Sequence, residues 1–368
     1  MGYNAGYLSI FELLRQMSHT QSQHPDTASA ILDLADATDF SDELDEGQPA
    51  SSQSTAQTVV VGDEWAGLRI DQVAAGLFSD YSRERLKQWI NEGQLTVDGQ
   101  QVKPKFRCNG GETLSLTVTL HVETHTAPEA MDLNIVYEDA DILIINKPAG
   151  LVVHPGAGNW SGTLVNGLLH YDPSLATLPR AGLVHRIDKD TSGLLVVARN
   201  LKAQHELSQQ LEDKSVYRVY DAVVVGHVIA GGTVNEPIRR HPIDRLKMSV
   251  QQGGRPSITH YRVAERFGTH TWLRVQLETG RTHQIRVHMS HINLPLVGDP
   301  VYGGRMRLPR GASPELTQAI QQFKRQALHA CELGLIHPRT REHLMFSAPL
   351  PEDMQQLLGV LRHEIGRA

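Results

Sequence analysis

A short polar segment followed directly by an apolar run constrains the fold of this chain more than any other feature. Residues His185–Gly193 have the sequence His-Arg-Ile-Asp-Lys-Asp-Thr-Ser-Gly, and the run Leu194–Ala198 follows without a break. A run of this length and composition predicts a buried strand. Because a strand fixes the turn at its end, such turns commonly carry functional groups. The sequence therefore predicts that Asp188, an ionisable residue, stands on a turn held by a core strand.

Length and composition are typical of a globular protein with two domains. The 368 residues suffice for two domains with a substantial core, and no stretch approaches the roughly 20 apolar residues of a membrane-spanning helix. The apolar segment Tyr7–Leu14 lacks the basic leader of a signal peptide. Cys108 and Cys331, the two cysteines, are too far apart in sequence for a metal or redox motif. These features predict a cytoplasmic protein without membrane association.

Charge is distributed unevenly between the first residues and the rest of the chain. Residues 1–57 contain nine Asp and Glu against a single Arg, whereas the remaining residues contain 34 Lys and Arg against 32 Asp and Glu. Residues 18–57 are also rich in Ser, Thr, Gln and Pro. Such a composition buries too little apolar surface to offset the entropy lost on ordering. We therefore expect residues 1–57 to be a disordered acidic tail ahead of a mildly basic folded part.

Residues 64–122 have the pattern of a small module that begins with two helices. Apolar residues at mostly helical spacing over Leu68–Leu77 predict the first helix. A second helix is expected to begin after Ser82, a favourable N-cap, and to stop at Gly93, which favours a helix C-terminus.

The second half of this module has the pattern of a hairpin. Asp98-Gly99, in the middle of Leu95–Val102, predicts a tight turn because both positions tolerate a positive φ. A closing strand is expected at Leu114–Val118.

Six basic residues cluster in this module. Three belong to the second helix and three follow the hairpin: Arg83, Arg85, Lys87, Lys103, Lys105 and Arg107. Lys and Arg on one face gain free energy from contact with nucleic-acid phosphates, through release of counterions. A solvated charged face is the alternative interpretation. The whole module resembles the α-L RNA-binding module of a small-subunit ribosomal protein, several RNA-modifying enzymes and tyrosyl-tRNA synthetases, which implies that these residues bind RNA.

The remaining part, residues 132–368, has the pattern of one larger α+β domain. Strands are expected at Ile142–Asn146, Leu194–Ala198, Val219–Val225 and Trp272–Leu277, and helices near Thr163–His170, Ala203–Glu212 and Pro314–Arg325. The strands follow one another with few regular β-α-β alternations. We therefore expect a mixed, largely antiparallel sheet.

Four segments of this domain carry the residues suited to chemistry. They are Glu138–Pro155, His185–Gly193, Arg218–Ala222 and Gly280–His288. In this order they resemble the motifs of the RluA-type pseudouridine synthases, enzymes that isomerise uridine in RNA. Gly231–Pro242 and Gly298–Arg305 are most similar to one branch of that family, which modifies a hairpin loop of the large ribosomal subunit RNA. A sibling branch that modifies other sites of the same RNA shares the four motifs.

The resemblance implies roles for four residues. Asp188 corresponds to the catalytic aspartate, which acts as a nucleophile or stabilises positive character at C1′. Arg286 corresponds to the arginine that pairs with this aspartate and keeps it ionised. Tyr220 corresponds to the tyrosine that lies against the target base, where its hydroxyl could assist removal of the C5 proton. Arg186 corresponds to the residue that fills the space left when the uridine leaves its stack.

The reaction expected of such a site needs no cofactor and no metal. Pseudouridine forms when the N1–C1′ bond breaks, the detached uracil turns and C5 joins C1′, without gain of an atom or a redox change. The expected substrate is large-subunit ribosomal RNA or a pre-ribosomal particle, and the expected state is a monomer. A non-catalytic RNA-binding factor in ribosome assembly is an alternative from a different functional class.

A second alternative concerns the residues around the aspartate. The segment Asp188–Ser192 comes close to the signature of haloacid-dehalogenase-type phosphatases, which use Mg²⁺. Two features oppose this reading: Ser192 stands at the last position, and the apolar strand follows the motif, whereas in those enzymes it precedes the motif. We therefore do not expect a phosphatase.

Overall fold

The computed structural model of the chain describes residues 54–119, 126–156, 158–244, 246–304, 308 and 311–365. The expected disordered tail, residues 1–57, therefore lies almost wholly outside the described residues. Its last residues are the exception, because strand β1 (Ser54–Val60) begins inside the predicted tail. β1 pairs antiparallel with β3 (Thr113–Thr119) along its whole length. The predicted end of the tail was thus wrong, since the threonines and valines of β1 favour a strand and have a sheet to join.

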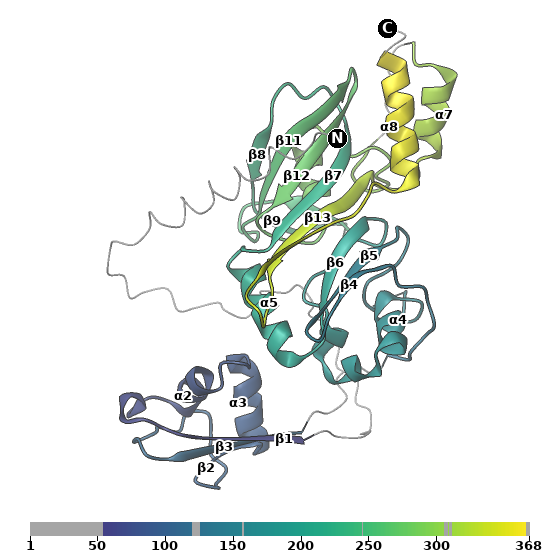
Figure 1. Cartoon of the computed structure of the whole chain (residues 1–368). Coiled ribbons are helices and arrows are strands. Elements are labelled where there is room, and N and C mark those ends of the chain that lie inside the picture. The colour runs from purple at the N-terminus through teal and green to yellow at the C-terminus, as the bar shows by residue number, and fades with distance from the viewer. Residues whose placement is uncertain are drawn as a thin grey trace. The chain divides into compact units, whose positions relative to one another are not determined.

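The segment that contains β1 and β3 forms a small module with its own apolar core (Figure 1). Its other elements are η1 (Asp63–Trp65), α2 (Ile70–Leu77), α3 (Arg83–Glu92) and β2 (Leu95–Val97). The strands have the order β1-β3-β2. α3 begins where the Ser82 hydroxyl accepts the Arg85 N–H (3.3 Å) and ends at Gly93, whose φ is 75°. Both helices of the module and both ends of α3 agree with the sequence prediction.

The predicted hairpin of the module is only partly formed. Asp98 and Gly99 make the expected turn, with φ values of 47° and 76°. The returning chain contributes only an isolated bridge between Gln100 and Val97, and β2 pairs with β3 instead. The residues after the turn are mostly exposed and include Pro104, which has no N–H to donate to a strand ladder. The closing strand, expected at residues 114–118, is present as β3.

The larger body is built on a nine-stranded mixed sheet of order β4-β5-β6-β13-β7-β12-β11-β8, with β14 paired to β13 (Figure 1). Among these strands only β6 and β13 run parallel; the other neighbours are antiparallel. The strands are β4 (Ile135–Glu138), β5 (Ile142–Lys147), β6 (Ser192–Ala198), β7 (Tyr217–Val225), β8 (Gly232–Asn235), β11 (Ile258–Phe267), β12 (His270–Leu277), β13 (Leu328–Ile336) and β14 (His343–Ser347). The expected α+β class with a largely antiparallel sheet is confirmed, and the four predicted strands are present.

Helices and a short second sheet complete the body. They are α4 (Leu164–Tyr171), η2 (Pro173–Thr177), η3 (Pro179–Gly182), α5 (Leu201–Glu212), β9 (Ile238–Arg240), β10 (Met248–Val250), α6 (Gln284–His291), α7 (Pro314–Gln322) and α8 (Glu352–Ile365). Of the three predicted helices, α7 ends earlier than expected because Phe323 leaves the helical conformation, with ψ at 95°. α6 and α8 were not predicted. Within the described ranges, no helix has the length and apolar character needed to cross a membrane.

The parallel pairing of β6 with β13 requires a glycine at position 193. This pairing holds the strand that directly follows the Asp188 turn. Its φ is 113°, and a Cβ at this position would lie 2.2 Å from the carbonyl oxygen of Ala330 on β13. We expect Gly193→Ala to destabilise the protein by about 3 kcal/mol or more, through steric overlap and backbone strain. Gly359→Ala is the matched control, because this α8 glycine has open space around it and the change should stabilise the helix by up to about 1 kcal/mol. Thermal melting of both variants checks this, and equal melting temperatures would contradict the described packing.

Candidate active site

Asp188 stands on a turn that is tied down at both ends. The carbonyl of Asp188 accepts the N–H of Thr191 (3.0 Å), which closes the turn before β6. At the other end, Nε2 of the buried His185 accepts the N–H of Val196 (3.0 Å). Burial lowers the pKa of His185 to about 3, so its ring is neutral at ordinary pH. His185 therefore anchors the loop and does not exchange protons.

Arg286, on α6, connects Asp188 to a second carboxylate. Its Nη1 donates to Oδ2 of Asp188 (2.9 Å), while Nε and Nη2 donate to the two oxygens of Asp299 (2.8 and 3.0 Å). The side chains of Arg286 and Asp299 are 5% and 0% exposed, whereas that of Asp188 is 16% exposed. Asp188 is therefore the member of this triad that a substrate can reach.

Asp299 holds the arginine in place because its own oxygens are engaged. Oδ1 also accepts the N–H groups of Val301 and Tyr302 (2.9 and 3.0 Å), and the Tyr302 ring centre lies 5.1 Å from the guanidinium carbon. Burial alone would lower the pKa of Arg286, but its bonds to Asp299 and the charge of Asp188 raise it. Burial likewise would raise the pKa of Asp299, and the bonds from Arg286 lower it. Asp188 thus faces a permanent and oriented cation.

Tyr220, on β7, lies close to the same carboxylate. Its side chain is almost fully buried, and burial raises the pKa of the phenol to about 12. The charge of Arg218 opposes this rise, and the charge of Asp188 adds to it. Tyr220 and Gly193 pair with Ala330 of β13 from its two sides, so Tyr220 lies two strands from β6, whose preceding turn carries Asp188. The structure therefore brings together Asp188, Tyr220 and Arg286, which come from three segments far apart in sequence.

Arg186 occupies the outer part of this site. It is exposed, although the residues on either side of it are buried. Its charge contributes to lowering the pKa values of His154 and His283, after the larger effect of burial. His283 in turn responds to the charge of Asp188. Arg186 therefore lies two residues before Asp188 on the same segment, with its side chain exposed to solvent.

Lys147, at the end of β5, is a site residue that the sequence analysis missed. Its side chain is fully buried, and Nζ donates to the carbonyls of Pro148, Leu151 and Lys189 (2.7, 2.9 and 2.8 Å). Lys189 directly follows Asp188, so these bonds fasten the turn to the end of β5. Burial lowers the pKa of Lys147 to about 7. The signal in the sequence was a lysine that directly extends a strand expected to be buried.

His283, which precedes α6, is the second residue missed. Its backbone is left-handed, with φ at 57°, a conformation that costs a non-glycine residue about 1–2 kcal/mol. Nδ1 lies 2.8 Å from the Tyr302 hydroxyl, which also accepts the N–H of Met248 (2.8 Å). The histidine is thereby linked to the loop that holds Asp299. Nothing in the sequence distinguished it from the other histidines of the chain.

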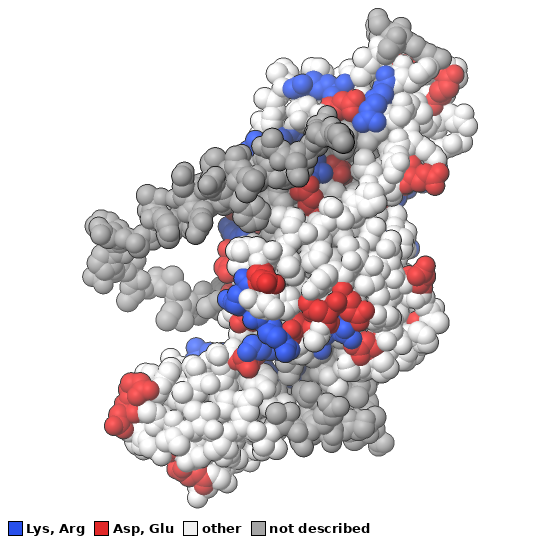
Figure 2. Space-filling model, viewed as in Figure 1, with Lys and Arg blue, Asp and Glu red and all other residues white. Residues whose placement is uncertain are grey.

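The six basic residues of the module do not share one environment. Nη2 of Arg83 donates to the buried Asp71 (2.7 Å), and Lys87 pairs with Glu84 (3.2 Å). Lys103, Lys105 and Arg107 are exposed, and Arg85 is partly exposed beside the Trp89 ring. Arg83 therefore has a structural partner within the module that the sequence did not reveal. On the face that Figure 2 shows, the module carries mostly acidic and uncharged side chains, so the basic set does not gather there.

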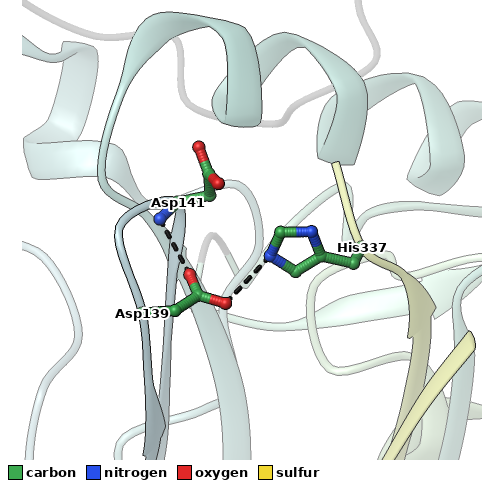
Figure 3. A group of neighbouring side chains, drawn as sticks. All are labelled: Asp139, Asp141 and His337. Atoms are coloured by element: carbon green, nitrogen blue, oxygen red, sulfur yellow. Dashed lines mark hydrogen bonds and ion pairs between the residues drawn. The ribbon is translucent and has the colours of Figure 1, made fainter. Parts of the chain in front are cut away.

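Asp139, Asp141 and His337 form a group whose ligand atoms are close enough to hold a metal ion (Figure 3). Protein donors already occupy its oxygens. Asp139 accepts two backbone N–H groups, the Tyr137 hydroxyl and the Nε2–H of His337. Asp141 takes both arms of Arg339 (2.7 and 2.8 Å). The group is therefore suited to tying the β4–β5 turn to the chain between β13 and β14, and it is poorly suited to a cation.

The comparison with known proteins agrees with this geometry. The family model described as RNA pseudouridylate synthase matches residues 141–291, which include Asp188, Tyr220 and Arg286, and the S4 domain model matches residues 68–114. A protein named ribosomal large subunit pseudouridine synthase D from Xanthomonas campestris pv. campestris is 54% identical over 315 residues, covering 86% of this chain and 95% of that protein. The chain belongs to the RNA pseudouridine synthase family.

Other pseudouridine synthases show the same similarity along the chain. Proteins with the same name from Escherichia coli strain K12 and Pseudomonas aeruginosa are 51% and 52% identical, over 84% and 82% of this chain and 96% and 94% of those proteins. The expected resemblance to the RluA-type pseudouridine synthases is confirmed, as is the expected small RNA-binding module. The chain is therefore an RNA-modifying isomerase, and the phosphatase alternative is discarded.

Proposed function

We propose that this pseudouridine synthase isomerises uridines of large-subunit ribosomal RNA, and that Asp188 carries the reaction. The observation that carries the proposal is the Arg286–Asp188 ion pair beside Tyr220, because it presents a fixed, partly exposed carboxylate next to an aromatic ring. The names of the relatives supply the RNA class. One chain contributes all three residues, so we propose a monomer as the active form. Both cysteines are free and buried, as suits a reducing cytoplasm.

Each residue of the triad has a task in the proposed reaction. The carboxylate of Asp188 either attacks the substrate or stabilises positive character at C1′ while the N1–C1′ bond breaks. Arg286 keeps that carboxylate charged and aimed. The high pKa of Tyr220 means a protonated phenol at neutral pH, which suits a stacking platform for the base better than direct acceptance of the C5 proton. The balance of atoms in an isomerisation requires neither a cofactor nor a metal.

We further propose that the module at residues 64–122 holds the RNA and that residues 132–368 form the catalytic domain. Lys103, Lys105 and Arg107 are exposed on one short segment, where phosphates can reach them. Arg85 and Lys87, on α3, add to the same charge. Arg83 contributes less in this proposal, because Asp71 already neutralises it.

Position-resolved mapping of pseudouridine in large-subunit ribosomal RNA tests the proposed function. A strain that lacks the enzyme should miss specific pseudouridines, and the wild-type protein should restore them. Asp188→Asn should restore none, because it removes the charge and keeps the shape, and the loss of a nucleophile costs several orders of magnitude in rate. Unchanged maps in all strains would refute the ribosomal substrate. If Asp188→Asn corrected every growth defect, the role as an assembly factor would be the dominant one.

Arg186 tests the expulsion of the target uridine from its stack. We expect Arg186→Ala to lower activity on a folded hairpin far more than on a flexible single strand with the same uridine. Opening a stacked base costs a few kcal/mol, and only the folded substrate incurs that cost in full. Arg186→Lys should recover little, because an ammonium does not stack as a planar guanidinium does. Single-turnover rates of the variants on the two RNAs measure this difference. Equal losses of rate on both RNAs would exclude a role for Arg186 in expelling the uridine.

A further inference from the structure

A second buried arginine lies on the same strand as Tyr220. Arg218 precedes Tyr220 by two positions on β7, so both side chains project from the same face of the sheet. Each residue is 6% exposed. Their proximity is also visible in the pKa of Tyr220, which the charge of Arg218 lowers. Arg218 therefore lies one strand pleat from Tyr220, on the same face of β7.

Arg218 has no carboxylate partner within the described ranges. Its one hydrogen bond there is a long contact from Nη2 to the carbonyl of Glu278 (3.3 Å), and its Nε is buried without any partner. Burial lowers the pKa of Arg218; Tyr220 opposes this effect, and the like charge of Arg281 adds to it. Arg274, on the neighbouring strand β12, is by contrast compensated by two carboxylates, because it pairs with Asp221 and Glu332.

The loop before α6 leaves room for this guanidinium. A Cβ at Gly280 would lie 2.6 Å from Nη1 of Arg218. Gly280 does not have a positive φ, so its backbone places no demand for glycine. The absence of a side chain at Gly280 therefore lets the guanidinium lie against this loop. The fold keeps a buried cation next to the catalytic residues and clears space around it.

A buried cation without a counter-charge destabilises a folded protein, and its removal in favour of an apolar side chain is often stabilising. Such a group is retained where a ligand supplies the missing charge. We propose that Arg218 binds the negative charge that develops on the uracil of the target uridine when its N1–C1′ bond breaks. The proposal rests on the proposed function, because it requires uridine isomerisation at Asp188.

The chemistry identifies uracil as the source of that charge. When the N1–C1′ bond breaks, its electron pair leaves with the base and spreads over N1 and the two carbonyl oxygens. Before C5 joins C1′, the detached ring is an anion beside Tyr220. A fixed guanidinium at this place stabilises the anion by its charge and hydrogen bonds, without a proton transfer. RNA phosphates remain largely hydrated, whereas Arg218 is nine-tenths buried beside the residue proposed to hold the ring.

Two substitutions of Arg218 and one control separate this role from a structural one. The substrate is large-subunit ribosomal RNA from a strain that lacks the enzyme, and the readouts are kcat, KM and melting temperature. We expect Arg218→Met to lower kcat about 10²–10³-fold, with KM nearly unchanged and melting temperature unchanged or raised. Arg218→Lys keeps the charge and should restore much of kcat. Arg274→Met, which leaves Asp221 buried without its cation, should lower the melting temperature and leave kcat within about threefold.

Each other result overturns the inference. A higher KM for Arg218→Met with unchanged kcat would make Arg218 a contact to the RNA backbone. A lower melting temperature with unchanged kcat would make it a support for the loop at Glu278. A wild-type enzyme that forms no pseudouridine in this RNA would instead refute the proposed function. Wild-type activity with a fully active Arg218→Met would refute the role of Arg218 alone.

Discussion

The active site depends on one guanidinium that is shared between two carboxylates. Arg286 binds Asp299 through two nitrogens and Asp188 through the third. Asp299 is fully buried and also accepts two backbone N–H groups, so it is the fixed end of this arrangement. Asp188 is the partly exposed end. The loop with Asp299, helix α6 and the turn before β6 must therefore fold together before the carboxylate can be aimed.

Three buried basic residues around this site differ in the partners that compensate their charge. Arg286 is compensated by carboxylates, and its pKa stays above its ordinary value. Lys147 donates to three carbonyl groups, and burial lowers its pKa to about 7 against the more distant charges of Asp190 and Asp188. Arg218 has one long hydrogen bond and no carboxylate in the described part of the chain. The degree of compensation falls from Arg286, which contacts the proposed catalytic carboxylate, to Arg218, which we propose to act on the leaving base. In this proposal the protein loses folding stability at Arg218, because the reaction needs a buried cation without a counter-charge there.

Many of the helices and strands could be predicted from local sequence patterns. Which strand pairs with which could not be predicted in the same way. The apolar runs at β5, β6 and β7 were sufficient to predict buried strands, and Asp98-Gly99 was sufficient to predict a turn. The turn did not decide which strand pairs with β2, because that depends on β3, which lies beyond an exposed segment with Pro104. Helices α6 and α8 were not predicted. α6 begins after His283, whose side chain makes no capping hydrogen bond, so its start lacks the usual signal.

In the candidate site, too, the sequence revealed the residues but did not reveal their interaction partners. The resemblance named Asp188, Tyr220 and Arg286, and the structure brings them together. Asp299 could not be assigned to Arg286 from the sequence, because pairing across a loop depends on how the loop folds. Arg83 illustrates the converse: a residue expected to face RNA has a buried acid as its partner. Residue types and local pattern are visible in a sequence, but the partner that decides a residue's charge state is a property of the folded chain.

Through its two hydrogen bonds, Asp299 fixes Arg286, which in turn orients Asp188. We would measure kcat of Asp299→Asn and compare it with that of Asp141→Asn, which alters a two-bond pair with the exposed Arg339 away from the site. We expect Asp299→Asn to lower kcat about 10–100-fold at nearly constant KM, and Asp141→Asn to leave kcat near wild type. A wild-type kcat for Asp299→Asn would mean that Arg286 orients Asp188 without help from Asp299.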